Sequence, residues 1–330
     1  MSREYNGAVK SFSRAAFSKY AWGVLAFNLA VILWGAFVRA SGSGAGCGNH
    51  WPLCNGEVIP HSPETAKLIE FTHRAMTGLD TPLILLLAVF AWRAFPRRHP
   101  ARTTAILSVL FLVIEALIGA GLVLLEKVAR NASAWWQSAH LLNTLTLLTC
   151  LTLTAWFGAG HAAIRPRGRA AWMAVVSVVI VALLGVSGAI AALGDTLFPA
   201  KSLAAGFAQD WDPAANIFLR LRALHPLLAA AAGAWVLYFA FSIAARRPEL
   251  RRPAFTVVAC VAVQLMAGAV NLLLLAPVPM QLVHLLLADL LWISLIVLCA
   301  STPEWPRRQL TPGSAHPERE PRSAGLSPSV

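Results

Sequence analysis

Long apolar stretches separated by short polar and basic segments dominate the chain. A stretch of about 20 apolar residues predicts a membrane-spanning helix, because that length crosses roughly 30 Å of hydrocarbon. Eight such stretches lie at residues 21–40, 68–92, 104–125, 134–157, 171–193, 218–243, 254–275 and 280–301. The first continues into Arg39 without a small-residue cleavage signature, which indicates a retained span and not a signal peptide. The pattern predicts an all-α integral membrane protein.

The apolar pattern also repeats within the chain. Residues 114–120 (IEALIGA) in the third span resemble residues 263–269 (VQLMAGA) in the seventh. Residues 137–142 (QSAHLL) in the fourth span resemble residues 281–286 (QLVHLL) in the eighth. Each half holds an even number of spans, so the repeat is a parallel one about an axis along the membrane normal. We therefore expect eight transmembrane helices arranged as two pseudo-symmetric four-helix bundles.

Composition supports this interpretation and divides the chain. The sequence is 57% hydrophobic and 13% charged, with a mean hydropathy of +0.63, which excludes disorder and an ordinary cytosolic enzyme. A tail rich in Pro, Ser and Arg follows the last span and is expected to be disordered. The N-terminal segment, the first four-helix half, the linker, the second half and the tail are expected at residues 1–20, 21–157, 158–170, 171–301 and 302–330.

The distribution of basic residues predicts the orientation. The formal net charge of +12 would suggest nucleic-acid binding in a soluble protein. The N-terminal segment, the three even-to-odd loops and the tail together carry +14, however, and the remainder carries −2. These five segments lie on one side of an eight-span chain, so both termini are predicted to be cytoplasmic, in the cell (inner) membrane. The charge orients the protein and does not indicate a nucleic-acid partner.

Four of the nine histidines lie inside predicted spans 2, 4, 6 and 8; they are His73, His140, His225 and His284. An ionisable residue within a membrane helix is costly unless it is paired or ligated. Two per repeat, always on even spans, favour axial ligation of haem iron, because facing helices of a bundle can clamp one porphyrin. Metal-ion transport and neutral histidines hydrogen-bonded between helices are the alternatives.

The depth of the histidines separates two haem-binding functions. Each lies about 4 to 7 residues from the outer end of its predicted span, or roughly 6 to 11 Å. Both expected sites are therefore side by side near the outer face. A cytochrome b that carries electrons across the membrane would place one haem near each side. The depth favours lateral electron exchange, or one cofactor beside a bound porphyrin substrate.

Charged residues near the first histidine suggest chemistry. Glu70 precedes His73 by one helical turn, so the two share a face, and a carboxylate there can relay protons or orient water. The alternative is a carboxylate at the membrane interface. Arg39 and Arg74 are expected to pair with haem propionates, or else to extend to the interface.

The second half differs at the matching positions. Arg222 replaces Glu70 one turn before its histidine, and Pro226 replaces Arg74. We therefore expect the first half to be reactive and the second to hold an anionic cofactor. For three further acids within spans no role beyond helix pairing is expected; they are Asp80, Glu115 and Asp289.

Two of the five cysteines stand apart. Cys47 and Cys54 lie in the first outer loop, where a disulfide is compatible with an oxidising compartment. Their spacing fits neither a standard zinc site nor a covalent haem-attachment motif. A structural staple and a redox or haem-handling role both remain open. The other three lie in apolar spans and are expected to be packing residues.

Taken together, these residues resemble the haem A synthase family of eight-span membrane oxidases. The resemblance covers residues from about 20 to 300 and is most specific in the first half. It rests on the four span histidines and on residues 35–44 (GAFVRASGSG), 51–56 (WPLCNG) and 69–74 (IEFTHR).

The resemblance implies an activity and its cofactor. The protein would oxidise the C8 methyl group of haem O to the formyl group of haem A, through successive hydroxylations and loss of water from a gem-diol. His73 and His140 would bind the iron of the substrate haem. His225 and His284 would bind the iron of a haem b cofactor that passes electrons onward.

Further roles follow from the same resemblance. Glu70 would be the essential acid near the substrate, and Cys47 with Cys54 would be a disulfide-forming pair that assists activity. Some members have a second cysteine pair in a later outer loop, but residues 194–217 contain none. Pro226 stands where the family commonly has Arg, so Arg222 is expected to replace the missing propionate contact.

The resemblance also implies partners. A haem O synthase would supply the substrate, and the assembly of terminal haem-copper oxidases would receive the product, all within membrane lipid. The sequence sets no oligomeric state and is compatible with a homo-oligomer. The rival hypothesis is a quinol-linked di-haem b-type electron carrier without haem-modifying activity. Glu70 and the cysteine pair favour the enzyme, because a carrier requires neither.

Overall fold

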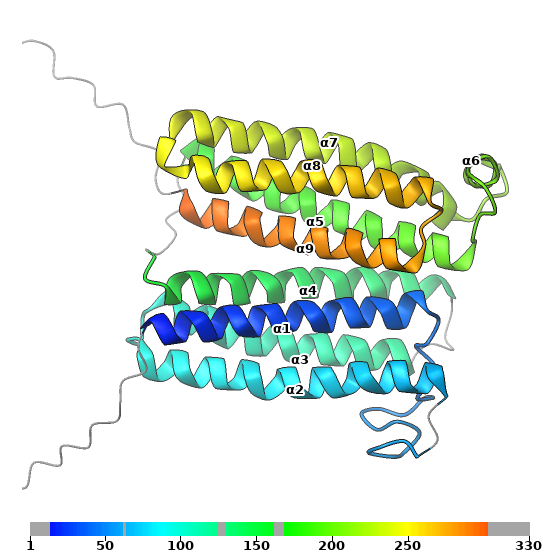
Figure 1. The fold of residues 1–330 in the computed structure, drawn as a ribbon, viewed down its shortest axis with the longest axis horizontal. Coiled ribbons are helices and arrows are strands. Elements are labelled where there is room, and N and C mark those ends of the chain that lie inside the picture. Colours follow the sequence, from blue (N-terminus) through cyan, green and yellow to red (C-terminus); the bar gives the residue numbers. More distant parts are fainter. Residues whose placement is uncertain (1–13, 62–63, 125–129, 162–167, 303–330) are drawn as a thin grey trace, which may run out of the picture.

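A computed structural model shows an elongated bundle of helices packed side by side (Figure 1). It describes residues 14–61, 64–124, 130–161 and 168–302. Their helices are α1 (Arg14–Ala40), α2 (Thr65–Ala94), α3 (Pro100–Leu124), α4 (Arg130–Gly158), α5 (Gly168–Leu197), α6 (Leu203–Trp211), α7 (Ile217–Arg246), the short η1 (Pro248–Leu250), α8 (Arg251–Leu273) and α9 (Val278–Ser301).

Eight helices in the described ranges are long and apolar enough to cross a membrane, so the chain is a multi-pass membrane protein. They confirm the eight predicted spans, but most are longer than expected. Helix α1 begins at Arg14, inside the segment expected to precede the first span, and α5 begins at Gly168, inside the expected linker. Hydropathy misses these ends because polar residues continue the helix beyond the apolar core. Most of the expected tail, residues 303–330, lies outside the described residues.

Helix α6 was not predicted. It lies between α5 and α7 at the end of the molecule opposite the start of α1 (Figure 1). The Ser202 hydroxyl caps it by accepting a 3.2 Å hydrogen bond from the Ala205 backbone N–H. Its nine residues are too few for a membrane span, and a span-length hydropathy search therefore overlooks them.

The long helices form two groups of four. In the first group α1 contacts α2, α2 contacts α3, α3 contacts α4, and α4 closes the ring on α1. In the second, α5, α7, α8 and α9 follow the same order and close in the same way. This arrangement matches the sequence repeat, which pairs α3 with α8 and α4 with α9. The contacts between the groups follow the same symmetry. Exchanging the halves turns the contact of α1 with α9 into that of α5 with α4, and it leaves the contact of α4 with α9 unchanged.

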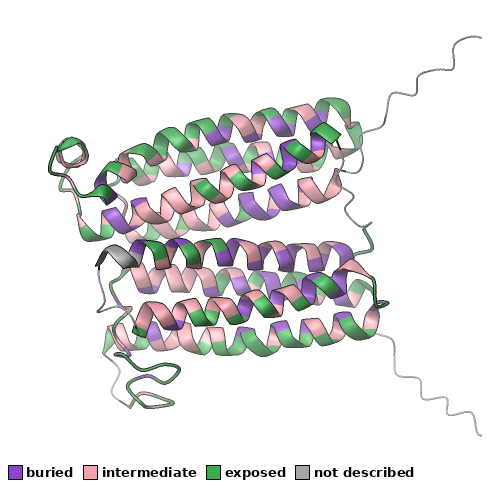
Figure 2. Cartoon of the chain, turned by 180° about the vertical axis from the view of Figure 1, so that it is seen from behind, coloured by how far each residue is buried: buried purple, intermediate pink, exposed green. Residues whose placement is uncertain are grey.

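Helices α4 and α9 connect the two groups through Trp292. This buried side chain donates its indole N–H to the Leu145 carbonyl at 2.9 Å and the Thr149 hydroxyl at 3.0 Å. Helix α4 is the most enclosed of the eight long helices. Figure 2 shows buried positions along helix sides that face one another and exposed positions along the outer sides.

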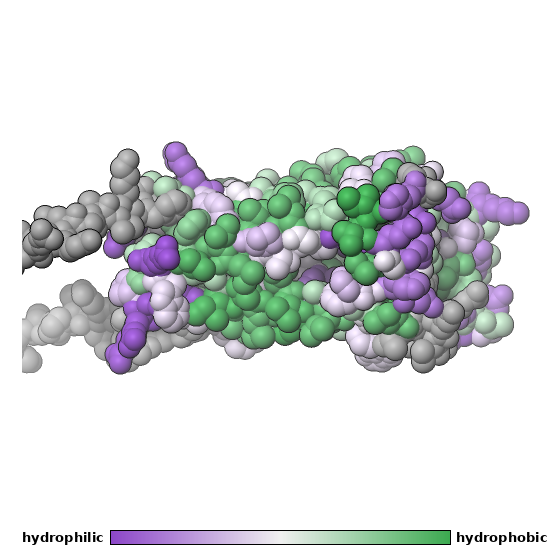
Figure 3. Space-filling view, turned by 90° about the horizontal axis from the view of Figure 1, so that it is seen from below, coloured by the Kyte–Doolittle hydropathy of each residue, from purple (hydrophilic) through white to green (hydrophobic). Residues whose placement is uncertain are grey.

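The outer surface is that of a membrane protein. Apolar residues cover the middle of the face in Figure 3, and hydrophilic residues gather toward its two ends. Large apolar side chains on the long helices remain exposed in the isolated chain, among them Trp92, Leu117, Trp172, Leu183 and Met266. Such a continuous apolar surface needs lipid around it. Helix α1 begins and α9 ends at the same end of the molecule (Figure 1).

Candidate functional site

The four span histidines occupy matching places in the two groups. His73 and His140 lie on α2 and α4, and His225 and His284 lie on α7 and α9. Each stands within about the first three turns of its helix. All four therefore lie toward the end of the molecule that carries α6 and the loop between α1 and α2 (Figure 1). The structure brings the predicted residues together at one level.

Each histidine ring packs against a glycine of the preceding long helix. A Cβ atom added to Gly35 would lie 2.8 Å from His73 Cε1, closer than van der Waals contact allows. The missing side chain therefore leaves room for the ring. For the other three pairs, the distance from an added Cβ atom to the nearest ring atom is 3.9 Å for Gly119 and His140, 3.0 Å for Gly188 and His225, and 3.0 Å for Gly268 and His284.

Each group holds two of the four imidazoles. His73 and His140 lie on α2 and α4, and His225 and His284 lie on α7 and α9. In each group the two helices that carry histidines lie diagonally across the ring of four. The Nδ1 atoms of His73 and His284 are buried and have no hydrogen-bond partner among the described residues. A ring nitrogen without a hydrogen-bond partner can use its lone pair to bind a haem iron as an axial ligand.

The two remaining histidines have partners at Nδ1. The Glu115 carboxylate of α3 lies 2.8 Å from His140 Nδ1. The Ser187 hydroxyl of α5 lies 2.8 Å from His225 Nδ1. A partner at Nδ1 leaves Nε2 as the ligand atom. The sequence alone did not identify Glu115 as a partner of a histidine ring. The signal that could have indicated it is the repeat of IEALIGA as VQLMAGA, which places both segments at the same spacing in the two halves.

Glu70 is held in place by the first outer loop. One carboxylate oxygen accepts a 2.8 Å hydrogen bond from the Cys47 backbone N–H, and the other is paired with the Arg74 guanidinium. The carboxylate is buried, since Glu70 is only 3% exposed. Glu70 and His73 are one turn apart on α2, as predicted, but the hydrogen-bond partners of Glu70 are loop and Arg74 atoms.

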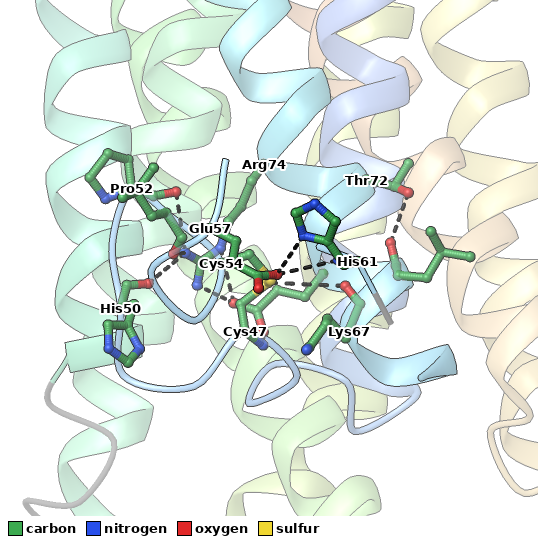
Figure 4. Close-up of a disulfide and its surroundings, with 12 residues drawn as sticks. Cys47, His50, Pro52, Cys54, Glu57, His61, Lys67, Thr72 and Arg74 are labelled. Carbon is green, nitrogen blue, oxygen red and sulfur yellow. Dashed lines mark hydrogen bonds and ion pairs between the residues drawn. A yellow bond between two sulfur atoms is a disulfide. The ribbon is translucent and has the colours of Figure 1, made fainter. Parts of the chain in front are cut away.

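Arg74 also holds the loop itself. Its Nη1 atom donates to the His50 carbonyl at 2.6 Å and to the Leu53 carbonyl at 2.7 Å. Cys47 and Cys54 form a disulfide that closes the same loop, and both are buried. Figure 4 shows Arg74 pointing into this loop. Arg74, predicted as a propionate partner, is therefore already hydrogen-bonded within the protein.

Arg222 plays a comparable part in the second group. It pairs with Asp210 of α6 at 2.5 Å and with Asp195 of α5 at 3.1 Å, and it donates to the Phe198 carbonyl at 3.3 Å. The Arg222 side chain is 11% exposed. These contacts join α6 and its loop to α7. Sequence reasoning missed both aspartates, because they come near Arg222 only in three dimensions.

The other charged candidates lie at contacts between helices. Arg39 of α1 donates to the Ala192 carbonyl of α5 at 3.3 Å and to the Gln281 amide oxygen of α9 at 3.2 Å, so it bridges the two groups. Asp80 accepts a 2.7 Å hydrogen bond from Asn28, as expected of helix pairing. Asp289 is buried, and its Oδ2 has no hydrogen-bond partner within the described part of the chain.

The fold and site define a class of protein: a multi-pass helical membrane protein with two histidines at matching positions in each half. A family of cytochrome oxidase assembly proteins (COX15-CtaA) matches residues 18–296. The chain belongs to this family.

Individual relatives carry two different names. A Thermus thermophilus protein named "Protoheme IX farnesyltransferase" is 47% identical over 292 residues, which cover 86% of this chain and 48% of that protein. The "Heme A synthase" of Halalkalibacterium halodurans is 42% identical over 122 residues, covering 37% of this chain and 41% of that protein. That of Alkalihalophilus pseudofirmus is 40% identical over 124 residues, covering 37% and 42%. The matched segments cover less than half the length of each of these relatives.

Proposed function

We propose that this protein is a haem A synthase, which oxidises the C8 methyl group of haem O to the formyl group of haem A. The observation that carries the proposal is the presence of two histidines at equivalent positions in each of two four-helix groups, with the Glu70 carboxylate in the first group alone. Family membership and the similarity to proteins named "Heme A synthase" support it. Those names favour a haem-modifying enzyme over a di-haem electron carrier.

In this proposal the two halves have different tasks. His73 and His140 hold the iron of the substrate haem, while His225 and His284 hold that of a haem b cofactor. Haem b supplies one-electron redox chemistry when bound. Glu70 accepts and returns protons at its carboxylate, and Arg74 and the Cys47 N–H keep that carboxylate in one position. The loop closed by Cys47 and Cys54 keeps this network over the site.

The proposed orientation follows from the basic residues. The end of the molecule where α1 begins and α9 ends faces the cytoplasm, and the histidine end faces the extracytoplasmic side of the inner membrane. The farnesyltransferase name of the Thermus relative supports a farnesylated haem as the molecule handled. A haem O synthase is therefore the proposed source of substrate, and terminal oxidase assembly receives the product.

One experiment tests the activity directly. The full chain is expressed with a haem O synthase in a host that makes no haem A, and the extracted haems are separated by chromatography. We expect haem A only when both proteins are present. Haem O that remains unconverted under every electron donor and acceptor regime would overturn the proposal. Farnesyl transfer to protohaem by the chain alone would favour the activity named for the Thermus relative.

A further inference from the structure

Glu115 and its neighbours form a polar cluster that the proposed function does not yet use. Besides lying against His140 Nδ1, the Glu115 carboxylate accepts hydrogen bonds from the Asn143 amide and the Thr144 hydroxyl of α4. The Asn143 amide also donates to the Phe111 carbonyl at 2.8 Å. The carboxylate is thus held by donors on the helix that carries the histidine, in a largely enclosed place between α3 and α4.

The second half lacks this cluster. The repeat aligns Glu115 with Gln264, and it aligns Asn143 and Thr144 with Leu287 and Ala288. The carboxylate and both of its supporting donors are therefore replaced by an amide and two apolar side chains. This difference between the halves adds to the replacement of Glu70 by Arg222.

The contact to the ring differs as well. Glu115 approaches His140 at Nδ1, whereas the Gln264 amide nitrogen lies 3.3 Å from Nε2 of His284. The Nδ1 atom of His284 is buried and unpartnered within the described residues. Only an N–H can approach a carboxylate oxygen at 2.8 Å favourably, so His140 carries its hydrogen at Nδ1 and presents Nε2 as the ligand atom.

We propose that Glu115 is a positioning residue for His140, giving the first half an axial ligand with greater donor strength than the matching ligand of the second half. A carboxylate that accepts the Nδ1–H of a ligating histidine fixes the ring and increases its electron donation to the metal. Stronger donation stabilises ferric over ferrous iron. This ligand therefore makes the midpoint potential of the haem held by His140 more negative. The inference rests on the proposed haem ligation by His140.

The test compares reciprocal variants of the full chain, purified with bound haems after co-expression with a haem O synthase. Glu115→Gln gives the first half the amide that the second half has at this position. Gln264→Glu gives the second half the carboxylate of the first. Spectroelectrochemical titration follows haem O or A separately from haem b, because the two types differ in their absorption bands. Equilibrium titration with ferric haem O gives the affinity of the first half.

We expect Glu115→Gln to weaken ferric haem O binding about 10- to 100-fold and to shift that haem to a more positive midpoint potential, with haem b unchanged. Each tenfold change in the ferric-to-ferrous affinity ratio corresponds to about 59 mV. Glu115→Asp should restore part of the shift. Gln264→Glu should move the haem b potential in the negative direction, which tests the inference even where Glu115→Gln fails to fold.

Asp80→Asn is the matched control, because it neutralises another carboxylate of the same half that is bonded to Asn28. It should leave both potentials unchanged. Wild-type affinity and potential in Glu115→Gln, in a protein that still converts haem O, would overturn this inference alone. A wild-type protein that binds no haem through His140 would overturn both this inference and the proposed function.

Discussion

The backbone N–H of Cys47 donates a 2.8 Å hydrogen bond to the carboxylate of Glu70, although the two residues are 23 positions apart in the sequence. The disulfide between Cys47 and Cys54 therefore acts on a loop that directly contacts the carboxylate proposed for proton transfer. Arg74 joins the same loop to the same carboxylate. The loop, the disulfide and the carboxylate therefore form one connected unit.

Replacing Cys47 and Cys54 by serine should loosen the loop and lower formyl production by roughly tenfold, because the fixed N–H donor to Glu70 is lost. Closing a short loop of this kind contributes about 2 kcal/mol to stability. Haem b content should stay at the wild-type level. Chromatography of extracted haems and thermal unfolding measure the two effects. Cys260→Ser, a change at a free cysteine of the second half, is the control; an equal loss there would contradict the prediction.

Glu70→Gln keeps the size of the side chain and removes its ability to accept and return a proton. We expect formyl production to fall by at least about 100-fold, the lower range for acid–base catalysis, with haem b retained. Glu57→Gln changes a more exposed carboxylate of the same loop and should have little effect. Full activity in Glu70→Gln would remove this residue from the proposed mechanism.

The glycines that face the histidines give a graded test of the two sites. Gly35→Ala places a methyl group 2.8 Å from His73 Cε1, whereas Gly119→Ala meets His140 only at 3.9 Å, an ordinary contact. Overpacking of this kind costs about 1 to 3 kcal/mol. Copurified haem O and A should therefore drop in Gly35→Ala and stay near wild type in Gly119→Ala. Equal haem contents in the two variants would argue against this geometry.

A glycine of the second half also lies against a histidine ring. Gly188→Ala places its methyl group 3.0 Å from His225 Cε1, so it should lower haem b and leave substrate haem binding in place. Pyridine haemochrome spectra distinguish the two haem types. A loss of substrate haem alone would contradict the proposed division between the halves.

Arg222→Met should release α6 from α7, because it leaves Asp195 and Asp210 without their shared cation. Breaking such a pair costs about 3 to 5 kcal/mol where it is fully buried, and less here because the Asp195 side chain is 30% exposed. We expect faster hydrogen exchange across residues 198–212. Arg220→Met, at an exposed position that bonds the Pro213 carbonyl, is the control. Loss of haem b with unchanged exchange would favour the propionate role expected from sequence.

The sequence could predict the spans, the repeat and the depth of the histidines, because hydropathy and spacing along a single helix decide them. It could also place Glu70 and His73 on one face of α2. It could not predict α6, which is too short to give a membrane signal and depends on its Ser202 cap. The longer helix ends were missed for a related reason, since interfacial residues continue a helix without being apolar.

What the sequence by itself determined is the class of the protein and its candidate ligands, since burying eight apolar segments in lipid leaves few architectures and makes every polar residue within them conspicuous. Only the tertiary structure decided what those ligands touch. Glu115 and His140 lie on different helices, as do Arg222 and Asp210, and such pairs depend on how the helices rotate and pack. Local sequence rules contain no information about that rotation, whereas the assembled bundle specifies it through close packing at small residues such as Gly35.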